Sequence, residues 1–299
     1  MNSIFKVVIY KIALKLFSFL DYTIELSGNK ITLPGESALR YNQSRFRLYD
    51  QFLPILAKHI PDNTSIIDVG ANSGDTLASM YLTDRNHVFL CIDADAKFFR
   101  YLKSNADLLP KSKDRIKVVN CLVGADVDNV VLIGTGTRTA KINPQIRGDL
   151  KLIRSRRLDE IVTENQVSNV SVIKSDVDGF DYDVLLSGTT TINNNQPVLY
   201  FECDARESCQ VDGYKKVLKI LSDGGYDQYA IFDNYGAIMA VVSDSTAVYE
   251  MISYTFNLNK LGSKRTLYYV DILAFNKKNN FALNALGEYR KFQSSFLSK

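Results

Sequence analysis

Short apolar runs rich in β-branched residues recur along the chain from residue 65 onward, and each predicts a strand. The first has the pattern of a strand buried on both faces. These runs are Ser65–Val69, Val88–Ile92, Ile116–Asn120, Val170–Ser175 and Val198–Glu202. Helix-like stretches alternate with them, at Asp75–Leu82, Ala96–Leu109, Leu158–Thr163, Tyr182–Ser187 and Gly213–Asp223. This alternation predicts an α/β fold, with a mostly parallel sheet and helices on both of its faces.

Weaker patterns before and after this alternation predict smaller elements. Tyr22–Leu26 and Lys30–Leu33 flank a Ser-Gly-Asn turn and predict a β-hairpin. Residues 34–44 are polar and predict a loop, whereas Phe46–Ile60 has a helical periodicity that ends at Pro61. Later runs predict further strands at Val130–Ile142, Gln228–Phe232, Ala237–Val242 and Leu267–Phe275.

The stretch Ile4–Leu20 is apolar, but Lys6, Lys11 and Lys15 interrupt it. These lysines make it a poor membrane-spanning segment, and no small-residue cleavage site of a secretory signal follows it. One hypothesis is an amphipathic helix that packs on the core, or on a second copy of the chain in a homo-oligomer. The alternative is an interfacial helix in peripheral contact with the anionic inner membrane.

Composition favours an ordinary globular protein. Apolar residues make up 46% of the 299 residues and charged residues 23%, and a net charge of +3 is too small to favour nucleic acid as a partner. The four cysteines, Cys91, Cys121, Cys203 and Cys209, have no disulfide-like spacing and predict reduced thiols in a cytoplasmic protein. With two histidines and no Cys-x-x-Cys pair, no structural zinc site is expected.

The turn after the first run, Gly70-Ala71-Asn72-Ser73-Gly74, carries the strongest binding signal. A strand that ends in a glycine turn before a helix presents free backbone N–H groups to a ligand, and glycine permits a close approach. Gly70 and Gly74 are four apart without a third glycine, unlike the dinucleotide fingerprint, and Asp68 and Asp75 would repel a pyrophosphate. A ligand with a cationic amine and ribose hydroxyls suits the turn better, and S-adenosylmethionine is such a ligand.

Acidic side chains also end the second strand run, where parallel sheets bind ligands. Asp93 is predicted to accept the ribose hydroxyls, with a helix-capping role as the alternative. Asp95 suits that cap better, and we count it with the cofactor site as well. Leu122 and Val123, after the third run, are either the two sides of an adenine site or core residues.

The fourth run leads into the densest polar cluster, residues 174–181, with the sequence Lys-Ser-Asp-Val-Asp-Gly-Phe-Asp. Lys174 and Asp176 are two apart and share one face of a strand, so we expect them to pair. Asp176 is the candidate base or orienting group for a substrate hydroxyl, and Lys174 the neutralising cation. Glu202 is expected to form a carboxylate pair with Asp176 or, alternatively, a divalent-ion site, although no metal is included in our prediction. The other aspartates of the cluster are either site residues or helix caps.

Together these segments resemble the FkbM-type methyltransferases, a class I S-adenosylmethionine-dependent family. The resemblance covers roughly residues 45–240 and rests on Leu48–Asp50, Ile66–Thr76, Arg157–Ile161, Ile173–Asp181 and Pro197–Glu202. It implies a Rossmann-like, seven-stranded catalytic domain over residues 45–299 and an N-terminal helix and hairpin extension over residues 1–44. It also implies cofactor contacts for Asp68, Gly70, Asn72, Gly74, Thr76 and Asp93, and active-site positions for Lys174, Asp176 and Glu202. Asp93, Asp178 and Asp181 stand where this family usually has glutamate.

The resemblance further implies an O-methyltransferase that acts on a sugar hydroxyl of a bacterial surface glycan, such as lipopolysaccharide O-antigen. A glycan or lipid-linked oligosaccharide is then the expected substrate, and a secondary-metabolite glycan is the alternative. The residues themselves leave open a NAD-dependent oxidoreductase and a non-catalytic cofactor-binding protein. An RNA methyltransferase is a third alternative, which the near-neutral charge disfavours.

Overall fold

The computed structural model describes residues 20–125, 130–132, 139–141, 152–262 and 266–296. The predicted helix over Ile4–Leu20 lies outside these ranges except for its last residue. In the part of the chain that is described, no helix is long and apolar enough to cross a membrane. All four cysteines are free.

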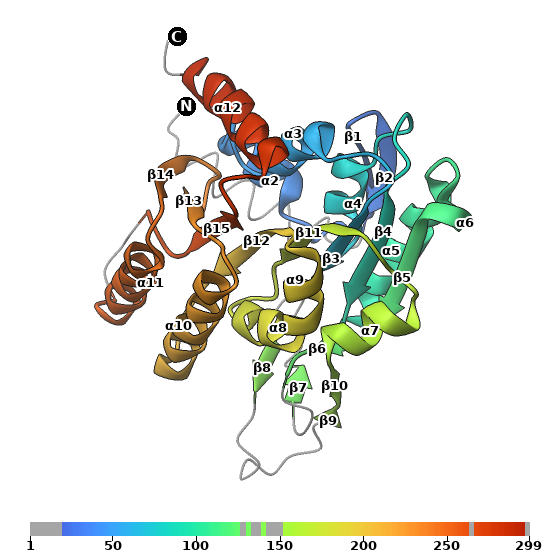
Figure 1. Cartoon of the computed structure of the whole chain (residues 1–299). Coiled ribbons are helices and arrows are strands. Elements are labelled where there is room, and N and C mark those ends of the chain that lie inside the picture. Colours follow the sequence, from blue (N-terminus) through green and yellow to red (C-terminus); the bar gives the residue numbers. More distant parts are fainter. Residues whose placement is uncertain (1–19, 126–129, 133–138, 142–151, 263–265, 297–299) are drawn as a thin grey trace.

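An eight-stranded sheet forms the centre of the fold, in the order β14-β13-β15-β12-β11-β3-β4-β5 (Figure 1). The strands from β12 to β5 are parallel to one another, and β15, β13 and β14 extend the sheet in antiparallel pairs. Their bounds are β3 Ser65–Val69, β4 Val88–Asp93, β5 Ile116–Asn120, β11 Val170–Ser175, β12 Val198–Cys203, β13 Gln228–Asp233, β14 Ile238–Val242 and β15 Val270–Phe275. The predicted α/β class and mostly parallel sheet are confirmed, with one strand more than the seven expected.

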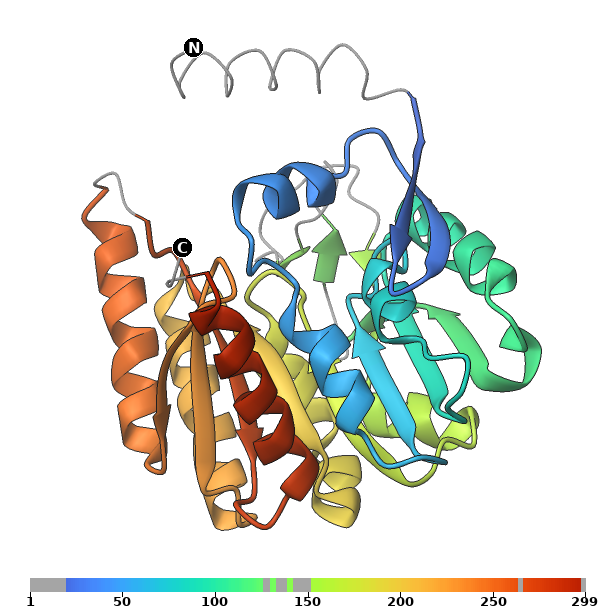
Figure 2. The same ribbon diagram turned by 90° about the horizontal axis from the view of Figure 1, so that it is seen from above.

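Helices cover both faces of this sheet (Figure 2). One face packs against α3 (Phe52–His59), α4 (Asp75–Met80), α5 (Ala96–Leu108) and α12 (Asn280–Ser294). The other face packs against α7 (Leu158–Glu164), α8 (Asp181–Ser187), α9 (Thr189–Asn195), α10 (Ser208–Asp223) and α11 (Ser245–Lys260). Successive residues of a strand point to opposite faces, so Ile66 belongs to one core and Ile67 to the other. Burial on both sides explains why the strand runs are apolar at nearly every position.

Shorter elements surround this central unit. A short helix, α6 (Ser112–Arg115), precedes β5. The two-residue strands β6 (Leu122–Val123) and β10 (Ser155–Arg156) pair with each other, and β7 (Val130–Leu132), β8 (Thr139–Lys141) and β9 (Leu152–Ile153) form a small sheet. The strands β7 and β8 fall within the predicted extra strands over Val130–Ile142, and the rest of that range lies outside the described residues.

The predicted hairpin is formed by β1 (Tyr22–Leu26) and β2 (Asn29–Leu33). Asn29 Nδ2 donates to the carbonyl oxygens of Ala78 and Tyr81, both at 2.8 Å. Asn105 of α5 accepts from the backbone N–H of Thr32 at 2.9 Å and donates to its carbonyl at 2.8 Å. Side-chain amides therefore fix the hairpin to α4 and α5.

Two predictions of local structure were wrong. Residues 34–44 are not a loop throughout, because α2 (Leu39–Arg45) begins within them. The helix predicted over Phe46–Ile60 begins only at Phe52, since Asp50 has a φ of 57°, in the left-handed region that no right-handed helix contains. This change of direction turns Tyr49 and Asp50 toward the carboxyl ends of the strands. Helices α9, α11 and α12 were not predicted.

Candidate active site

The chain order reverses between β3 and β11, the two central parallel strands. From β3 the chain proceeds to β4 and β5 on one side, and it returns through β11 to the other side. Ligands bind at the carboxyl ends of strands next to such a reversal. A cavity of about 980 Å³ is lined there by residues from both sides, including Gly70, Asp93, Asp176 and Glu202. This volume is at the upper end for small-molecule sites, so a cofactor and part of an acceptor fit together.

The glycine turn after β3 brings two parts of the chain into contact. Gly70 has a φ of 77°, and a Cβ there would lie 1.9 Å from the carbonyl oxygen of Asp176. Gly74 has a φ of 84°, and its Cβ would lie 3.2 Å from Leu102 of α5. We expected the glycines to leave room for a ligand, but the space beside them is filled by the protein itself. Gly70 lines the cavity along with Asn72 and Thr76, whereas Gly74 is not among the lining residues described.

A buried ion pair joins β3 to β11 next to the cavity. Asp68 and Lys174 are register partners, and Lys174 Nζ lies 3.1 Å from Asp68 Oδ1 and 3.1 Å from the carbonyl oxygen of Gly70. Burial alone would lower the pKa of Lys174, but the carboxylates of Asp68 and Asp176 raise it above its usual value. Burial raises the pKa of Asp68, and Lys174 opposes that rise. Asp68 therefore fixes Lys174 from the side away from the cavity and does not itself line the cavity.

Asp176 stands between this ion pair and the open cavity. Its Oδ2 lies 3.6 Å from Lys174 Nζ, which confirms the predicted pairing. Its side chain is 55% exposed, and its backbone N–H donates to the carbonyl of Val69 at 3.0 Å. One side of the carboxylate is thus fixed and the other is accessible, as a base or orienting group requires.

The loop after Asp176 is held by Asp181, which is fully buried. Its Oδ1 accepts from the Ser175 hydroxyl at 2.6 Å and from the N–H of Val177 at 3.2 Å, and its Oδ2 accepts from the N–H of Gly179 at 3.3 Å. Burial and the nearby Asp176 raise the pKa of Asp181 to about 7. Asp181 is not the helix cap that was one of its two predicted roles, because the N-cap of α8 is Phe180. Its carboxyl group instead holds the preceding loop together.

On the β4 side, Asp93 is oriented by two backbone groups. Its Oδ2 accepts from the N–H of Asn72 at 2.7 Å and its Oδ1 from the N–H of Asp95 at 2.8 Å, and burial raises its pKa to about 6. Each oxygen retains a lone pair that can accept a ribose hydroxyl. Asp95 caps α5 as predicted, because its side chain accepts from the N–H groups of Lys97 and Phe98. Leu122 and Val123 line the same cavity and offer apolar surface to a base. These residues fit an adenine nucleoside, and the ribose role of Asp93 stays a prediction.

The β12 side of the cavity is acidic. Glu202 is the penultimate residue of β12, is 8% exposed, and faces Asp271 of β15 as its register partner. Burial raises the pKa of both carboxyl groups well above the ordinary range, with a further contribution from Asp176. Sequence reasoning missed Asp271, because one aspartate within a late strand carries no distinct signal. It also assigned no role to Asp50, although Asp50 lies in a segment that resembles the family; both residues line the cavity.

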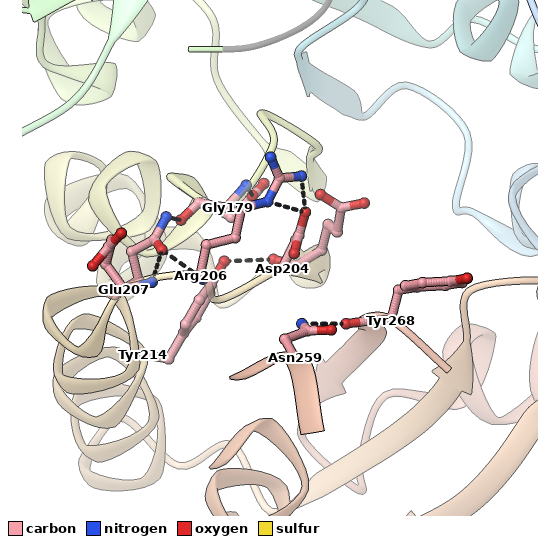
Figure 3. A network of polar contacts seen from close by, with 10 residues as sticks. Gly179, Asp204, Arg206, Glu207, Tyr214, Asn259 and Tyr268 are labelled. Carbon is pink, nitrogen blue, oxygen red and sulfur yellow. Dashed lines mark hydrogen bonds and ion pairs between the residues drawn. The ribbon is translucent and has the colours of Figure 1, made fainter. Parts of the chain in front are cut away.

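Gln210 of α10 connects the two loops that follow β11 and β12. Its Nε2 donates to the carbonyl of Gly179 at 3.0 Å, and its Oε1 accepts from the N–H groups of Arg206 at 2.7 Å and Glu207 at 2.8 Å. Gly179 also touches the Asp204 backbone, since a Cβ there would lie 2.2 Å from the Asp204 carbonyl oxygen. The Arg206 guanidinium pairs with the Asp204 carboxylate (Figure 3). The two loops therefore form one rigid margin of the cavity.

Comparison with solved structures finds several methyltransferases of similar fold. The methyltransferase FkbM of Methylobacillus flagellatus KT is 18% identical, with a TM-score of 0.40. The match covers 65% of this chain and 54% of that protein, so this chain spans about half the length of that protein. Fibrillarin of Aeropyrum pernix, solved with natively bound S-adenosylmethionine, is 14% identical over 75% of this chain and 82% of that one, with a TM-score of 0.40. The precorrin-6y C5,15-methyltransferase of Geobacter metallireducens GS-15 is 10% identical over 78% of this chain and 95% of that one, with a TM-score of 0.36. No curated protein matched the sequence.

A family comparison of the sequence is decisive. The model of the methyltransferase FkbM domain matches residues 68–227, more than half of the 299-residue chain. The matched region runs from Asp68 of β3 to the start of β13, and so contains most of the cavity wall. The match confirms the resemblance seen in the sequence, and with it the cofactor S-adenosylmethionine that the resemblance implied. The chain belongs to the FkbM family of methyltransferases.

Proposed function

We propose that this methyltransferase methylates a sugar hydroxyl of a bacterial surface glycan, such as lipopolysaccharide O-antigen. The observation that supports this most is the position of Asp176. Its carboxylate is fixed on one side by Lys174, at 3.6 Å, and is otherwise open to a cavity large enough for a cofactor and a sugar ring. A hydroxyl placed there meets a hydrogen-bond acceptor that can also take its proton.

The half of the cavity formed by β3, β4 and β5 is where the cofactor would bind. Asp93 would accept the ribose hydroxyls, and the turn residues Gly70 and Asn72, with Thr76 after them, would contact the rest of the nucleoside. When bound, S-adenosylmethionine supplies a methyl group on a positively charged sulfur. Asp68 and Gly74 would act indirectly, Asp68 by fixing Lys174 and Gly74 by packing against α5.

Asp176 orients the acceptor hydroxyl and accepts its proton. As the new carbon–oxygen bond forms, the carbon–sulfur bond breaks, and S-adenosylhomocysteine and a methyl ether are the products. Lys174 holds Asp176 through its ion pair and is itself held by Asp68 and by the Gly70 carbonyl. Much of the rate acceleration then comes from alignment of the two reacting atoms.

Mass spectrometry of surface polysaccharide, from cells with and without this protein, tests the proposal. We expect the polysaccharide to lack one methylene increment per modified sugar when the protein is absent. Unchanged polysaccharide would contradict a surface-glycan acceptor and would favour a secondary-metabolite glycan. A titration that compares the binding of S-adenosylmethionine with that of NAD separates both methyltransferase hypotheses from the oxidoreductase alternative.

We further propose that the reaction takes place at the cytoplasmic side of the inner membrane, on a lipid-linked glycan. The argument for this location is the lysine-interrupted apolar stretch Ile4–Leu20. Binding of the full chain and of a chain lacking residues 1–19 to anionic vesicles tests it. Equal binding of the two forms would contradict the proposed contact.

A further inference from the structure

Three carboxyl groups line the part of the cavity that the cofactor residues do not occupy. Glu202 and Asp271 lie opposite each other on β12 and β15, and Asp50 reaches the same cavity from the segment before α3. We call these three residues the acidic wall. They come from the β12 side of the topological reversal, whereas the ribose candidate Asp93 comes from the β4 side.

No cation of the described chain forms an ion pair with the acidic wall. The basic residues that line the cavity are Lys97, Lys174 and Arg206, and each has a carboxylate partner elsewhere: Glu36 at 2.7 Å for Lys97, Asp68 at 3.1 Å and Asp176 at 3.6 Å for Lys174, and Asp204 for Arg206. Within the described residues, no ion pair reaches Asp50, Glu202 or Asp271.

Glu202 gives a second and independent indication of a ligand. The residue is 8% exposed, and its Oε2 is buried without a hydrogen-bond partner in the part of the chain that the structure describes. Buried polar atoms are nearly always paired in folded proteins, so an unpaired carboxyl oxygen at a cavity wall indicates a donor that arrives with a ligand. The Asp271 carboxyl group is hydrogen-bonded to the Tyr200 side chain and retains capacity for a further donor.

The chemistry of that donor follows from the charges. An ammonium group has three donors and no acceptor, and its charge favours the ionised form of the three carboxyl groups, whose pKa values burial raises. A phosphate or a carboxylate at the same place would find no free cation among the described residues and would be repelled by each ionised carboxylate of the wall. A neutral hydroxyl can donate one hydrogen bond but compensates no charge.

Resting on the proposed sugar methylation, we propose that the acceptor is an amino sugar whose free ammonium group binds at the acidic wall of Glu202, Asp271 and Asp50. The hydroxyl that receives the methyl group then lies at Asp176, on the adjacent strand end. A sugar phosphate or a uronic acid is excluded from this position by the same wall.

Three hexose derivatives that differ in charge provide the test: methyl glucosaminide with its ammonium group, methyl glucoside, and methyl glucuronide with its carboxylate. Their binding to the full chain saturated with S-adenosylhomocysteine is measured by ligand-observed NMR at neutral pH, because acidification would protonate the wall. We expect the glucosaminide to bind about tenfold or more tightly than the glucoside, the factor that a partly desolvated charge contact provides, and the glucuronide not to bind. Equal binding of the glucoside and glucosaminide, detectable binding of the glucuronide, or no binding of the glucosaminide overturns the proposal.

Variants connect the preference to the wall. Glu202→Gln and Asp271→Asn are made singly and as a double variant. In the double variant the preference for the ammonium sugar should fall at least about tenfold, while binding of the neutral sugar changes little. Glu250→Gln, an equal loss of charge on the exposed surface of α11, is the matched control and should retain the preference. A preference that persists in the double variant overturns the assignment. Binding of S-adenosylhomocysteine itself is measured first in every protein: its absence from the unaltered chain contradicts the proposed function, whereas its presence without charge discrimination contradicts the amino-sugar inference alone.

Discussion

The buried pair of Asp68 and Lys174 permits a sharp test of how the centre of the site is held together. We consider Lys174→Met, which keeps the length of the side chain and removes its charge. The Asp68 residue is 1% exposed and the Lys174 side chain 5%, so water cannot replace the lost ammonium group. Loss of one partner from such a pair costs about 3–5 kcal/mol of unfolding free energy, because the remaining charge is buried and unpaired.

Protonation of Asp68 limits this loss and gives it a characteristic pH dependence. Burial already raises the pKa of Asp68, and removal of Lys174 raises it further, since Lys174 opposes the rise. The folded variant then binds a proton that the unfolded chain has released. Its stability therefore falls as pH rises above the ordinary aspartate range, and is partly recovered on acidification.

Urea denaturation followed by circular dichroism measures these effects, at neutral and at mildly acidic pH. The double variant Asp68→Asn with Lys174→Met should lose only about 1 kcal/mol, because no charge remains buried. Asp176→Asn, which removes the exposed partner, should change stability by less than about 1 kcal/mol. A loss below about 1 kcal/mol for Lys174→Met, or an equal loss in the double variant, would refute the reasoning.

Three further outcomes follow from the geometry of the site. Asp176→Asn should abolish turnover on the proposed glycan acceptor while cofactor affinity, measured by calorimetry, stays within about twofold. Loss of both or of neither would contradict its assigned role. Gly70→Ala should lower the unfolding free energy by about 2–4 kcal/mol, since the added Cβ would lie 1.9 Å from the Asp176 carbonyl oxygen. Gly28→Ala is the control, because Gly28 also has a positive φ but nothing lies within 4 Å of the added Cβ, and it should cost only about 1 kcal/mol. The pKa of Asp181 is raised to about 7, so the folded state binds its proton more tightly and this group's contribution to stability falls as pH rises from about 4 to about 7. Asp181→Asn should flatten that part of the stability profile, and an unchanged slope in denaturation measurements would contradict it.

The strands were well predicted because their signal is strong and local. A strand covered on both faces is mostly apolar, as the fully buried β3 (Ser65–Val69) is. The runs Ile116–Asn120 and Val170–Ser175 coincide with β5 and β11. The helices α11 and α12 were missed although each has a buried stripe. In α12 that stripe is Ala282, Ala285, Leu286 and Tyr289, where alanines weaken the contrast between the two faces.

The candidate site was predictable only where its residues follow strands in the chain. Lys174 and Asp176 are neighbours in sequence, so their pairing could be inferred from strand geometry. The contact of Lys174 with Asp68 depends on the register of β11 against β3, which the sequence does not contain. Asp50 reaches the cavity through a left-handed residue conformation, and Asp271 through an antiparallel strand far along the chain. Both depend on tertiary packing, and they supply two of the three carboxyl groups of the acidic wall.

The side chain of Gln210 links the loop beside the proposed base Asp176 to the other margin of the proposed acceptor site. This side chain is hydrogen-bonded to the backbone of both loops, the one beside Asp176 and the one beside Asp204. A residue inserted into either loop would shift the other as well. New acceptors are therefore easier to acquire by changing side chains on the wall than by remodelling these loops, and we expect diversification within such enzymes to leave the length of both loops intact.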